Sequence, residues 1–368
     1  MSMRWRHPLH GLPFDEPIAN GLAEEFSAMP WLRRAQAMRK AAFREVALLA
    51  TGQSRRRVAR VPPGVCSILW VYTWTTVGDA IMDLAPRNLV PQRIALDLLV
   101  APALAPLFQN DRRVRTVHTD PDTLRGDVDF VLLDALRSPS LRLKQQIFPR
   151  LPFATMRGHN IGERFDRTAY ADRRIRQLFG LPTGAVVQPT LDLGDVGRSV
   201  RNEPRMRIAV ALGARVSHRR YPRWNEVLRD IVAGWPRGFA APEFRLLGTG
   251  GTARKDLKGI DADFLARHCI VEIDSGDLRK AVFDIGDCDV FLGVDGGLMH
   301  VAVAVGKPGL ALFADIDPAH RLRPGTTMRS IRSDGEVSRV DAGRVAAEFL
   351  AALPSFVVAG THARAART

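Results

Sequence analysis

The sequence predicts an α/β protein with two Rossmann-like halves. Apolar, strand-like runs alternate with helical segments along most of the chain, which is the pattern of parallel sheets covered by helices. The alternation begins at Val65 and begins again at Met206. The length of 368 residues also suits two domains, because domains with one core usually run to roughly 100–200 residues.

The first half has five strand candidates, and helical spans separate them. The strand candidates are residues 65–74, 93–101, 114–118, 128–133 and 153–158. The first helical span is AIMDLAPRNLVPQ, residues 80–92. A tract rich in Pro, Gly and polar residues at 181–205 indicates a linker to the second half.

The second half repeats the alternation. Its strand candidates are residues 206–212, 243–251, 269–274, 290–294 and 309–315, and its helix candidates are residues 223–235, 257–266, 277–287, 298–306 and 343–353. The residues after Pro354 are expected to form a flexible tail. We therefore expect domains at residues 63–200 and 201–354, with an extension at residues 1–62 and a tail at residues 355–368.

The extension is basic and has helical spacing of apolar residues from Pro17 to Leu49. A basic linker, TGQSRRRVARVPPG, follows it. Such a helix either packs on its own domain or lies on an anionic membrane surface. Both interpretations are kept.

Composition narrows the classes of partner. The formal net charge of +14 attracts nucleic acid, anionic membranes or phosphorylated substrates. The arginines are spread along the chain, and no helix-turn-helix, zinc-finger or RNP signature occurs, so nucleic acid is not an expected partner. A solvated, arginine-rich surface is the alternative interpretation of the charge.

The sequence also bears on metals and location. The three cysteines show no zinc-ligand spacing, so no metal is expected. No stretch approaches the roughly 18–20 uninterrupted apolar residues that cross a bilayer, and the first residues lack the apolar core of a signal peptide. A cytoplasmic protein is expected, with peripheral attachment to the inner membrane as the alternative.

One segment, residues 289–318, is typical of an anion site. Its sequence is DVFLGVDGGLMHVAVAVGKPGLALFADIDP. A strand should end at Val294 and a helix should start near Leu298. The first turn of a helix has unpaired backbone N–H groups and positive partial charge, so it suits a pyrophosphate.

The residues in that turn fit the same ligand. Gly296 and Gly297 let an anion approach the backbone, and His300 can donate a hydrogen bond to it from the first turn. Asp295 either caps the helix or holds a ribose hydroxyl. The turn alone could equally be an ordinary strand-to-helix connection.

The length of the pattern decides between these interpretations. The segment resembles the D-x-G-L-x-H-x-A-x-A-x-G-K-P…D-P signature of glycosyltransferase family 9, the ADP-heptose:lipopolysaccharide heptosyltransferases of bacteria and their relatives. The matching residues are Asp295, Gly297, Leu298, His300, Ala302, Ala304, Gly306, Lys307, Pro308, Asp317 and Pro318. The resemblance implies a GT-B architecture, with two Rossmann-like domains facing across a cleft.

Two further stretches resemble the family. VGDAIMDLAP is similar to its G-D…P turn, which implies that Asp79 is the catalytic base, with Thr75, Thr76 and Gly78 on the acceptor side. A simple helix cap is the alternative role for Asp79. HRRYPRWNEVL is similar to the K-x-W-P segment, with Arg219 at the position of the phosphate-binding lysine.

The expected donor site gathers these residues. It comprises Arg219, Thr249, Asp295, Gly296, Gly297, Leu298, Met299 and His300. Thr249 belongs to it because the glycine-rich strand end around it can border the nucleotide base, although a plain turn is equally compatible. The sequence departs from the family at Gly296, where Thr or Ser is usual, and at Thr73, where Arg or Lys is usual.

The resemblance implies metal-independent, inverting transfer of heptose or a related sugar from a nucleotide diphosphate sugar. ADP-heptose is the expected donor, and a glycan, a lipid-linked glycan or a protein is the expected acceptor. The D-x-D string of Asp315 and Asp317 falls in the family's D-P turn and not in a metal loop. The alternative is a degenerate GT-B protein that binds a nucleotide or a partner without turnover.

Overall fold

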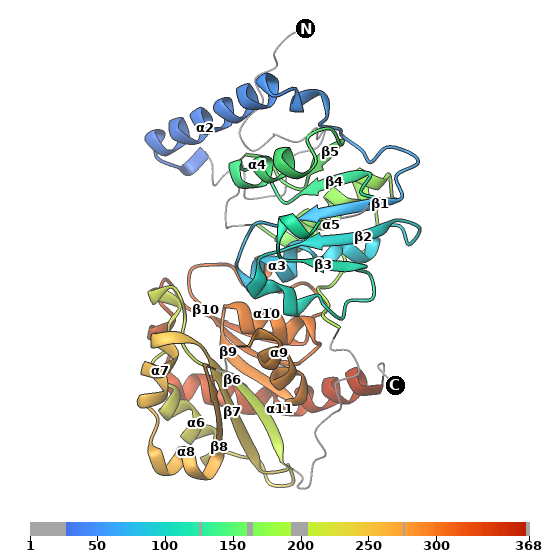
Figure 1. Cartoon of the computed structure of the whole chain (residues 1–368). Helices are drawn as coiled ribbons and strands as arrows, with labels where there is room; N and C mark the ends of the chain where they lie inside the picture. Colours follow the sequence, from blue (N-terminus) through green and yellow to red (C-terminus); the bar gives the residue numbers. More distant parts are fainter. Residues whose placement is uncertain (1–26, 125–126, 160–164, 193–204, 275–276, 366–368) are drawn as a thin grey trace. The chain divides into compact units, whose positions relative to one another are not determined.

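The computed structural model describes residues 27–124, 127–159, 165–192, 205–274 and 277–365. The chain divides into two compact units, Met1–Pro189 and Thr190–Thr368. Each unit is built on its own sheet with helices around it (Figure 1). The predicted start of the N-terminal helix and most of the linker at 193–204 lie outside the described residues.

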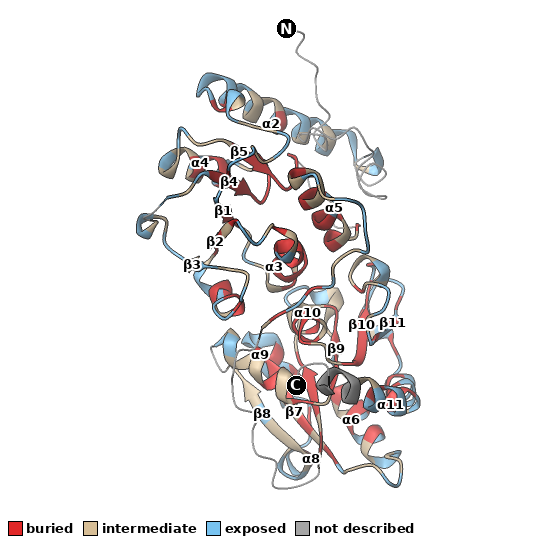
Figure 2. Ribbon diagram, turned by 90° about the vertical axis from the view of Figure 1, so that its right-hand side faces the viewer, coloured by how far each residue is buried: buried red, intermediate tan, exposed pale blue. Residues whose placement is uncertain are grey.

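The sheet of unit 1 has the strand order β3-β2-β1-β4-β5, and its described strands pair in parallel. The strands are β1 (Ser67–Val71), β2 (Ala95–Leu99), β3 (Thr116–His118), β4 (Phe130–Leu133) and β5 (Phe153–Thr155). Every residue of β1, β4 and β5 is buried, as expected for parallel strands covered on both faces (Figure 2).

The helices of unit 1 follow its strands. They are α2 (Trp31–Ala50), α3 (Val77–Asp83), α4 (Ser138–Ile147) and α5 (Arg167–Phe179), with single 3₁₀ turns at η2 (Gln53–Arg55), η3 (Ala85–Leu89), η4 (Pro102–Leu107) and η5 (Pro121–Thr123). The single helix predicted at 80–92 was wrong. It begins earlier, at Val77, and changes to a 3₁₀ turn before Pro86, which cannot donate a helical hydrogen bond.

The sheet of unit 2 has the order β11-β10-β9-β6-β7-β8, again with parallel pairs. Its strands are β6 (Met206–Ala211), β7 (Pro242–Gly248), β8 (Cys269–Ile273), β9 (Val290–Val294), β10 (Gly309–Phe313) and β11 (Met328–Arg332). The sequence interpretation missed β11. Only Met328 and Ile331 of this edge strand are buried, so it carries little apolar signal.

The helices of unit 2 correct a second prediction. They are α6 (Trp224–Ala233), α7 (Gly250–Lys258), α8 (Ala262–His268), α9 (Leu278–Asp287), α10 (Gly297–Ala304) and α11 (Ala342–Ala365), with 3₁₀ turns at η6 (Ser217–Arg219), η7 (Pro318–His320) and η8 (Val337–Arg339). The one helix predicted at 257–266 is two helices that part at Gly259. The glycines after Thr249 begin α7 and do not end a strand.

The last helix corrects the predicted tail. Helix α11 passes through Pro354 and ends at Ala365, and Phe356 is 2% exposed in the core of unit 2. Among the described residues, Ala342–Ala359 is one stretch that is long and apolar enough to span a membrane by length and composition alone. The core helix of a globular domain passes the same test. Phe349 and Leu353 of α11 are fully buried in such a core.

Both sheets are doubly wound. The chain lays strands outward in one direction from a central strand and then returns to lay the others on its opposite side. The order reverses between β1 and β4 in unit 1, and between β6 and β9 in unit 2. Ligands of such sheets bind outside the carboxyl ends of the strands at this reversal. The fold therefore marks one place in each unit where a site is expected.

Candidate active site

In unit 1, the loop after β1 carries Asp79 to the reversal point. Thr76 occupies the N-cap position of α3, so Asp79 lies in the first turn and not at the cap. The Thr76 hydroxyl donates to Asp79 Oδ2 at 2.6 Å, and Arg167 Nε lies 3.3 Å from Asp79 Oδ1. The Asp79 side chain remains 26% exposed. The carboxylate is thus held on two sides and still reaches solvent.

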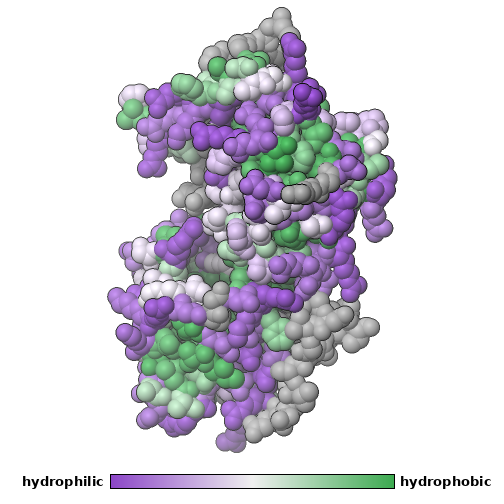
Figure 3. All heavy atoms as spheres, in the orientation of Figure 1, coloured by the Kyte–Doolittle hydropathy of each residue, from purple (hydrophilic) through white to green (hydrophobic). Residues whose placement is uncertain are grey.

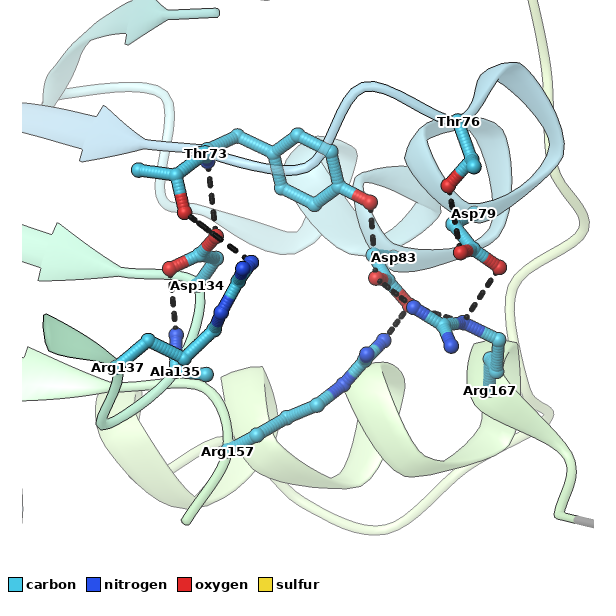
Figure 4. Close-up of polar contacts among 10 residues, drawn as sticks. Thr73, Thr76, Asp79, Asp83, Asp134, Ala135, Arg137, Arg157 and Arg167 are labelled. Carbon is cyan, nitrogen blue, oxygen red and sulfur yellow. Dashed lines mark hydrogen bonds and ion pairs between the residues drawn. The ribbon is translucent and has the colours of Figure 1, made fainter. Parts of the chain in front are cut away.

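A buried charge network supports this carboxylate (Figure 4). Arg167 forms two hydrogen bonds to Asp83, Nε to Oδ1 at 3.1 Å and Nη2 to Oδ2 at 2.7 Å. Arg157 also pairs with Asp83, and the Tyr72 hydroxyl donates to Asp83 Oδ2 at 3.0 Å. Two parallel N–H···O bonds fix a guanidinium in orientation as well as in place. Arg167 therefore links Asp79 to a fixed buried anchor.

Burial shifts the pKa values of two groups in this network. Burial, helped by the charge of Arg167, lowers the pKa of Arg157 to about 9. Burial also raises the pKa of the Tyr72 hydroxyl above its ordinary value. Both shifts have the direction that desolvation produces. Asp83, Arg157 and Arg167 are buried, so their charges interact more strongly than they would in water.

Asp134 closes the other side of the reversal point, just after β4. It accepts hydrogen bonds from the Thr73 amide at 2.8 Å, the Thr73 hydroxyl at 2.7 Å and the Ser140 hydroxyl at 2.6 Å. Burial raises the pKa of Asp134, and these hydrogen bonds oppose the shift. The buried carboxylate fixes the start of the loop that leads to Asp79.

The side chain of Arg137 lies beside Thr73. The guanidinium of Arg137 lies 3.9 Å from the centre of the Trp74 ring, and its Nη1 is 3.5 Å from the Thr73 hydroxyl. The family pattern has a basic residue at position 73, and this chain brings positive charge there from the loop after β4. Of the residues expected on the acceptor side, Thr75 is exposed and Gly78 is buried inside α3.

In unit 2, the structure brings together three expected donor residues from two adjacent strands. Asp295 follows β9, Arg219 lies in η6 after β6, and His300 is in α10. Arg219 Nη1 lies 3.3 Å from Asp295 Oδ2, and His300 Nε2 lies 3.9 Å from Asp295 Oδ1. Asp295 and His300 are each only 4% exposed. The cluster sits at the reversal between β6 and β9.

The N-terminus of α10 opens beside this cluster. Gly296 is the N-cap residue in an extended conformation (φ −172°), and a Cβ there would meet nothing closer than the Val294 carbonyl at 3.8 Å. The backbone therefore accepts residues other than glycine at this position. Leu298 is half-buried, and Met299 is fully buried, so Met299 can offer a ligand only its backbone.

The loop that carries Arg219 is anchored by a buried aspartate. Asp256 of α7 accepts from the Gly213 amide at 2.9 Å and from Arg220 Nε at 2.7 Å. Gly213 has φ +75°, and a Cβ there would lie 2.6 Å from the Ala253 amide nitrogen, so only glycine fits. Thr249, exposed at the N-cap of α7, lies on the next strand end of the same edge.

Acidic side chains such as those of Asp315 and Asp317 in the D-P turn can bind metal ions. Within the part of the chain that the structure describes, no group of three or more His, Cys, Asp or Glu residues could hold a metal ion. Asp317 caps η7 by accepting from the Ala319 amide at 2.9 Å, and Asp315 faces His218 at 3.3 Å. Asp317 thus has its partner within the D-P turn, whereas the partner of Asp315 comes from η6.

Several residues at these sites were not found from the sequence. They are Asp83, Asp134, Arg137, Arg157, Arg167, Arg220 and Asp256. The pairs that hold the unit 1 network together are distant along the chain: Arg167 is 84 residues from Asp83, and Thr73 is 61 residues from Asp134. No local spacing rule connects them, and the chain contains 53 Lys and Arg residues from which to choose.

A comparison with models of protein families finds a match, which lies in unit 2. Residues 276–334, which include Asp295, His300 and the α10 turn, match the family model of glycosyltransferase family 9 (heptosyltransferase). No curated protein sequence matches the chain. The matched segment covers β9 to β11 of unit 2.

Solved structures are similar over most of the chain. Heptosyltransferase II of E. coli, described as an ADP-heptose lps heptosyltransferase, is 18% identical with a TM-score of 0.62, covering 79% of this chain and 98% of its own. A family 9 glycosyl transferase from Veillonella parvula is 12% identical, with a TM-score of 0.60 and coverage of 79% and 97%. E. coli heptosyltransferase WaaC with ADP is 14% identical, with a TM-score of 0.59 and coverage of 79% and 99%.

Two doubly wound units of this kind define the GT-B fold of glycosyltransferases. The family match adds the signature turn of the second unit to that fold. The chain therefore has the fold of these glycosyltransferases, and its residues 276–334 match glycosyltransferase family 9 (heptosyltransferase).

Proposed function

We propose that the protein transfers heptose or a related sugar from a nucleotide diphosphate sugar, with ADP-heptose as the donor. The acceptor is a hydroxyl of a glycan, a lipid-linked glycan or a protein. The observation that carries the proposal is the cluster of Arg219, Asp295 and His300 around the α10 N-terminus, at the reversal point of unit 2. ADP is the natural first ligand to test, because a protein of similar fold was solved with it.

The donor diphosphate fits this cluster chemically. The backbone N–H groups at the start of α10 offer hydrogen bonds and positive partial charge to an anion. Arg219, oriented by Asp295, adds a full positive charge. Negative charge grows on the diphosphate as its bond to the sugar breaks, so these fixed groups stabilise the transition state without a metal ion.

Asp79 is the general base of the proposed reaction. It takes the proton from the acceptor hydroxyl while that oxygen bonds to the anomeric carbon and the diphosphate leaves with the bonding electrons. A single displacement of this kind inverts the anomeric carbon. Each carboxylate oxygen can accept more than one hydrogen bond, so the contacts to Thr76 and Arg167 orient Asp79 without occupying it fully.

The first experiment is a thermal-shift panel of ADP, UDP, GDP and CDP on the full chain. A ligand at a hundred times its dissociation constant adds nearly 3 kcal/mol of stability, so the preferred diphosphate should stand out. Arg219→Gln should lose the shift, and Arg229→Gln should keep it, since Arg229 is half-exposed on α6 and pairs with Asp261.

The second experiment measures turnover. ADP-heptose is incubated with the protein and with lipid-linked glycan, free glycan or protein acceptors, and released ADP is measured. Acceptor-dependent ADP release supports transfer. A diphosphate that binds with no acceptor-dependent release from its sugar nucleotides would favour the degenerate binding protein, and a panel without any shift would remove the donor site itself.

A further inference from the structure

Helix α2 has two apolar sides, and only one of them meets its own unit. Ala41 and Leu48 are buried, and Leu48 belongs to the core cluster that contains Phe153. At 3.6 residues per turn these two side chains point in nearly the same direction. The contact is narrow, and most of the helix surface stays exposed or half-exposed (Figure 2).

The outward side of α2 is rich in large apolar residues. They are Trp31 (70% exposed), Leu32 (55%), Met38 (45%), Phe43 (72%), Val46 (58%) and Leu49 (50%). Among the described residues, these are six of the ten exposed large hydrophobic side chains. On an ideal helix they fall within an arc of about 140°. Figure 3 shows hydrophobic atoms together with hydrophilic ones over α2.

Most of the charged residues of α2 are basic. Its five basic residues are Arg33, Arg34, Arg39, Lys40 and Arg44, and Glu45 is its one acidic residue, so the helix carries +4 (five minus one). Glu45 is already paired with Arg57 at 2.8 Å and with His159 at 2.9 Å. Basic residues with long stems can lie beside an apolar arc and extend their charges past it.

The N-terminal half of α2 extends past one edge of unit 1. Arg44 Nη1 donates to the His159 carbonyl at 2.9 Å, just beyond the carboxyl end of β5. After α2, Gln53 Nε2 donates to the Pro149 carbonyl, which precedes β5. The helix thus runs from the carboxyl edge towards the amino edge of the sheet. No residue from 31 to 40 is buried, so this half projects at the edge that holds Asp79.

We propose that α2 is an interfacial helix that docks the protein on the surface of an anionic lipid bilayer. An outward arc of Trp, Phe, Leu and Met beside Lys and Arg is the composition that binds such surfaces. A second copy of the chain is the less favourable occupant, because two helices of +4 on chains of +14 repel each other. Docking through α2 brings the carboxyl edge of unit 1 close to lipid.

The test is co-sedimentation of the full chain with vesicles. One set contains phosphatidylcholine alone, and the other contains a large share of phosphatidylglycerol. Val46→Glu on α2 is compared with Val358→Glu on α11, because the two valines are 58% and 57% exposed. We expect the wild type and Val358→Glu to bind anionic vesicles, and Val46→Glu to bind them at least tenfold more weakly.

The charges are tested in the same way. Arg33→Gln with Lys40→Gln is compared with Arg229→Gln with Arg279→Gln, a pair of exposed arginines in unit 2. Both double variants lower the net charge by two. The first should weaken binding to anionic vesicles about thirtyfold, at roughly tenfold per 1.4 kcal/mol, and the second much less.

Three outcomes would overturn the proposal. They are equal vesicle binding by Val46→Glu and Val358→Glu, no preference for anionic over neutral vesicles, and a dimer in solution that Val46→Glu dissociates while vesicles bind neither form. The last outcome would assign the outward side of α2 to a second copy. Since no readout uses nucleotide or turnover, failure here leaves the proposed sugar transfer untouched.

Discussion

The two units have the same order of central strands, but different side chains lie at the reversal point of each sheet. In unit 1, Asp79 is backed by Arg167, which is itself held by buried Asp83. In unit 2, Asp295 faces Arg219 and His300 beside the open N-terminus of α10. The common fold fixes where a site lies, and the side chains decide which half of a reaction the site serves.

The side chains at the two reversal points differ because a general base and a diphosphate site have different requirements. A base must be aimed at one hydroxyl, so Asp79 is held by a bidentate, buried arginine anchor. A diphosphate site must admit a large anion and stabilise it, so the backbone N–H groups of a helix that starts at glycine are placed near Arg219. The two units should therefore respond differently to substitution at their reversal points.

The largest effect is expected on turnover. Asp79→Asn keeps the shape of the side chain and removes the base, so the rate of sugar transfer should fall by about 10²–10⁴-fold. The measurement is ADP release with an acceptor that supports wild-type turnover. Asp120→Asn, an exposed N-cap residue in the same unit whose cap an asparagine preserves, is the control. Equal rates for the two variants would contradict the role of Asp79.

Removal of one arginine from an ion pair should lower the free energy of unfolding more in unit 1 than in unit 2. Arg167→Met leaves part of the buried Asp83 charge uncompensated, so the free energy of unfolding should fall by about 3–5 kcal/mol. Arg229→Ala in unit 2 breaks a half-exposed pair with Asp261 and should cost at most about 1 kcal/mol. Urea unfolding measures both. Similar losses would show that the network around Asp83 is no stronger than a surface pair.

The contact between α2 and unit 1 should depend on pH. Burial alone would raise the pKa of Glu45, but hydrogen bonds from His159 and Arg57 outweigh it and lower the pKa to about 2. The contribution of Glu45 to stability is therefore complete above its ordinary pKa of 4.5 and is lost as the pH falls from about 4.5 towards 2.

Urea unfolding of the wild type and Glu45→Gln across this pH range tests the prediction. The difference in unfolding free energy between the two should shrink as the pH falls. Glu348→Gln, an exposed residue on α11, is the control. A difference that stays constant with pH would mean that Glu45 does not hold α2 through its charge.

The smallest effect is expected at the donor turn. Gly296→Ser should change stability by only a few tenths of a kcal/mol, because the position is extended, a Cβ fits, and serine caps a helix about as well as glycine. Gly309→Ala on β10 should destabilise clearly, since its Cβ would lie 2.2 Å from the Phe291 carbonyl. Equal destabilisation in urea unfolding would mean that the α10 start is tightly packed.

Much of the fold was predictable because its signals are local. The apolar runs of β1, β6 and β9 and the glycine turn before α10 each fit within a few residues of sequence. The family signature around Asp295 is equally local. Arg219 and Asp295, 76 residues apart, could be paired only because that resemblance named both of them.

What the sequence could not predict depends on distant partners or on weak local patterns. Strand β11 is an edge strand with Arg329, Ser330 and Arg332 at its exposed positions, so it has no run of apolar residues in the sequence. The helical part of the predicted tail was missed because Pro354 suggested an end, although Phe356 beyond it packs in the core. The Asp83 network joins residues from several elements, and no regular spacing along the chain predicts it.

The most direct measurement is a calorimetric titration of ADP into the wild type, Asp79→Asn and Asp295→Asn, with Asp317→Asn as the control from the same edge of unit 2. We expect Asp79→Asn and Asp317→Asn to bind ADP as the wild type does, and Asp295→Asn to bind it more weakly by about 1–3 kcal/mol. Weakened binding in Asp79→Asn together with unchanged binding in Asp295→Asn would contradict the assignment of donor binding to unit 2.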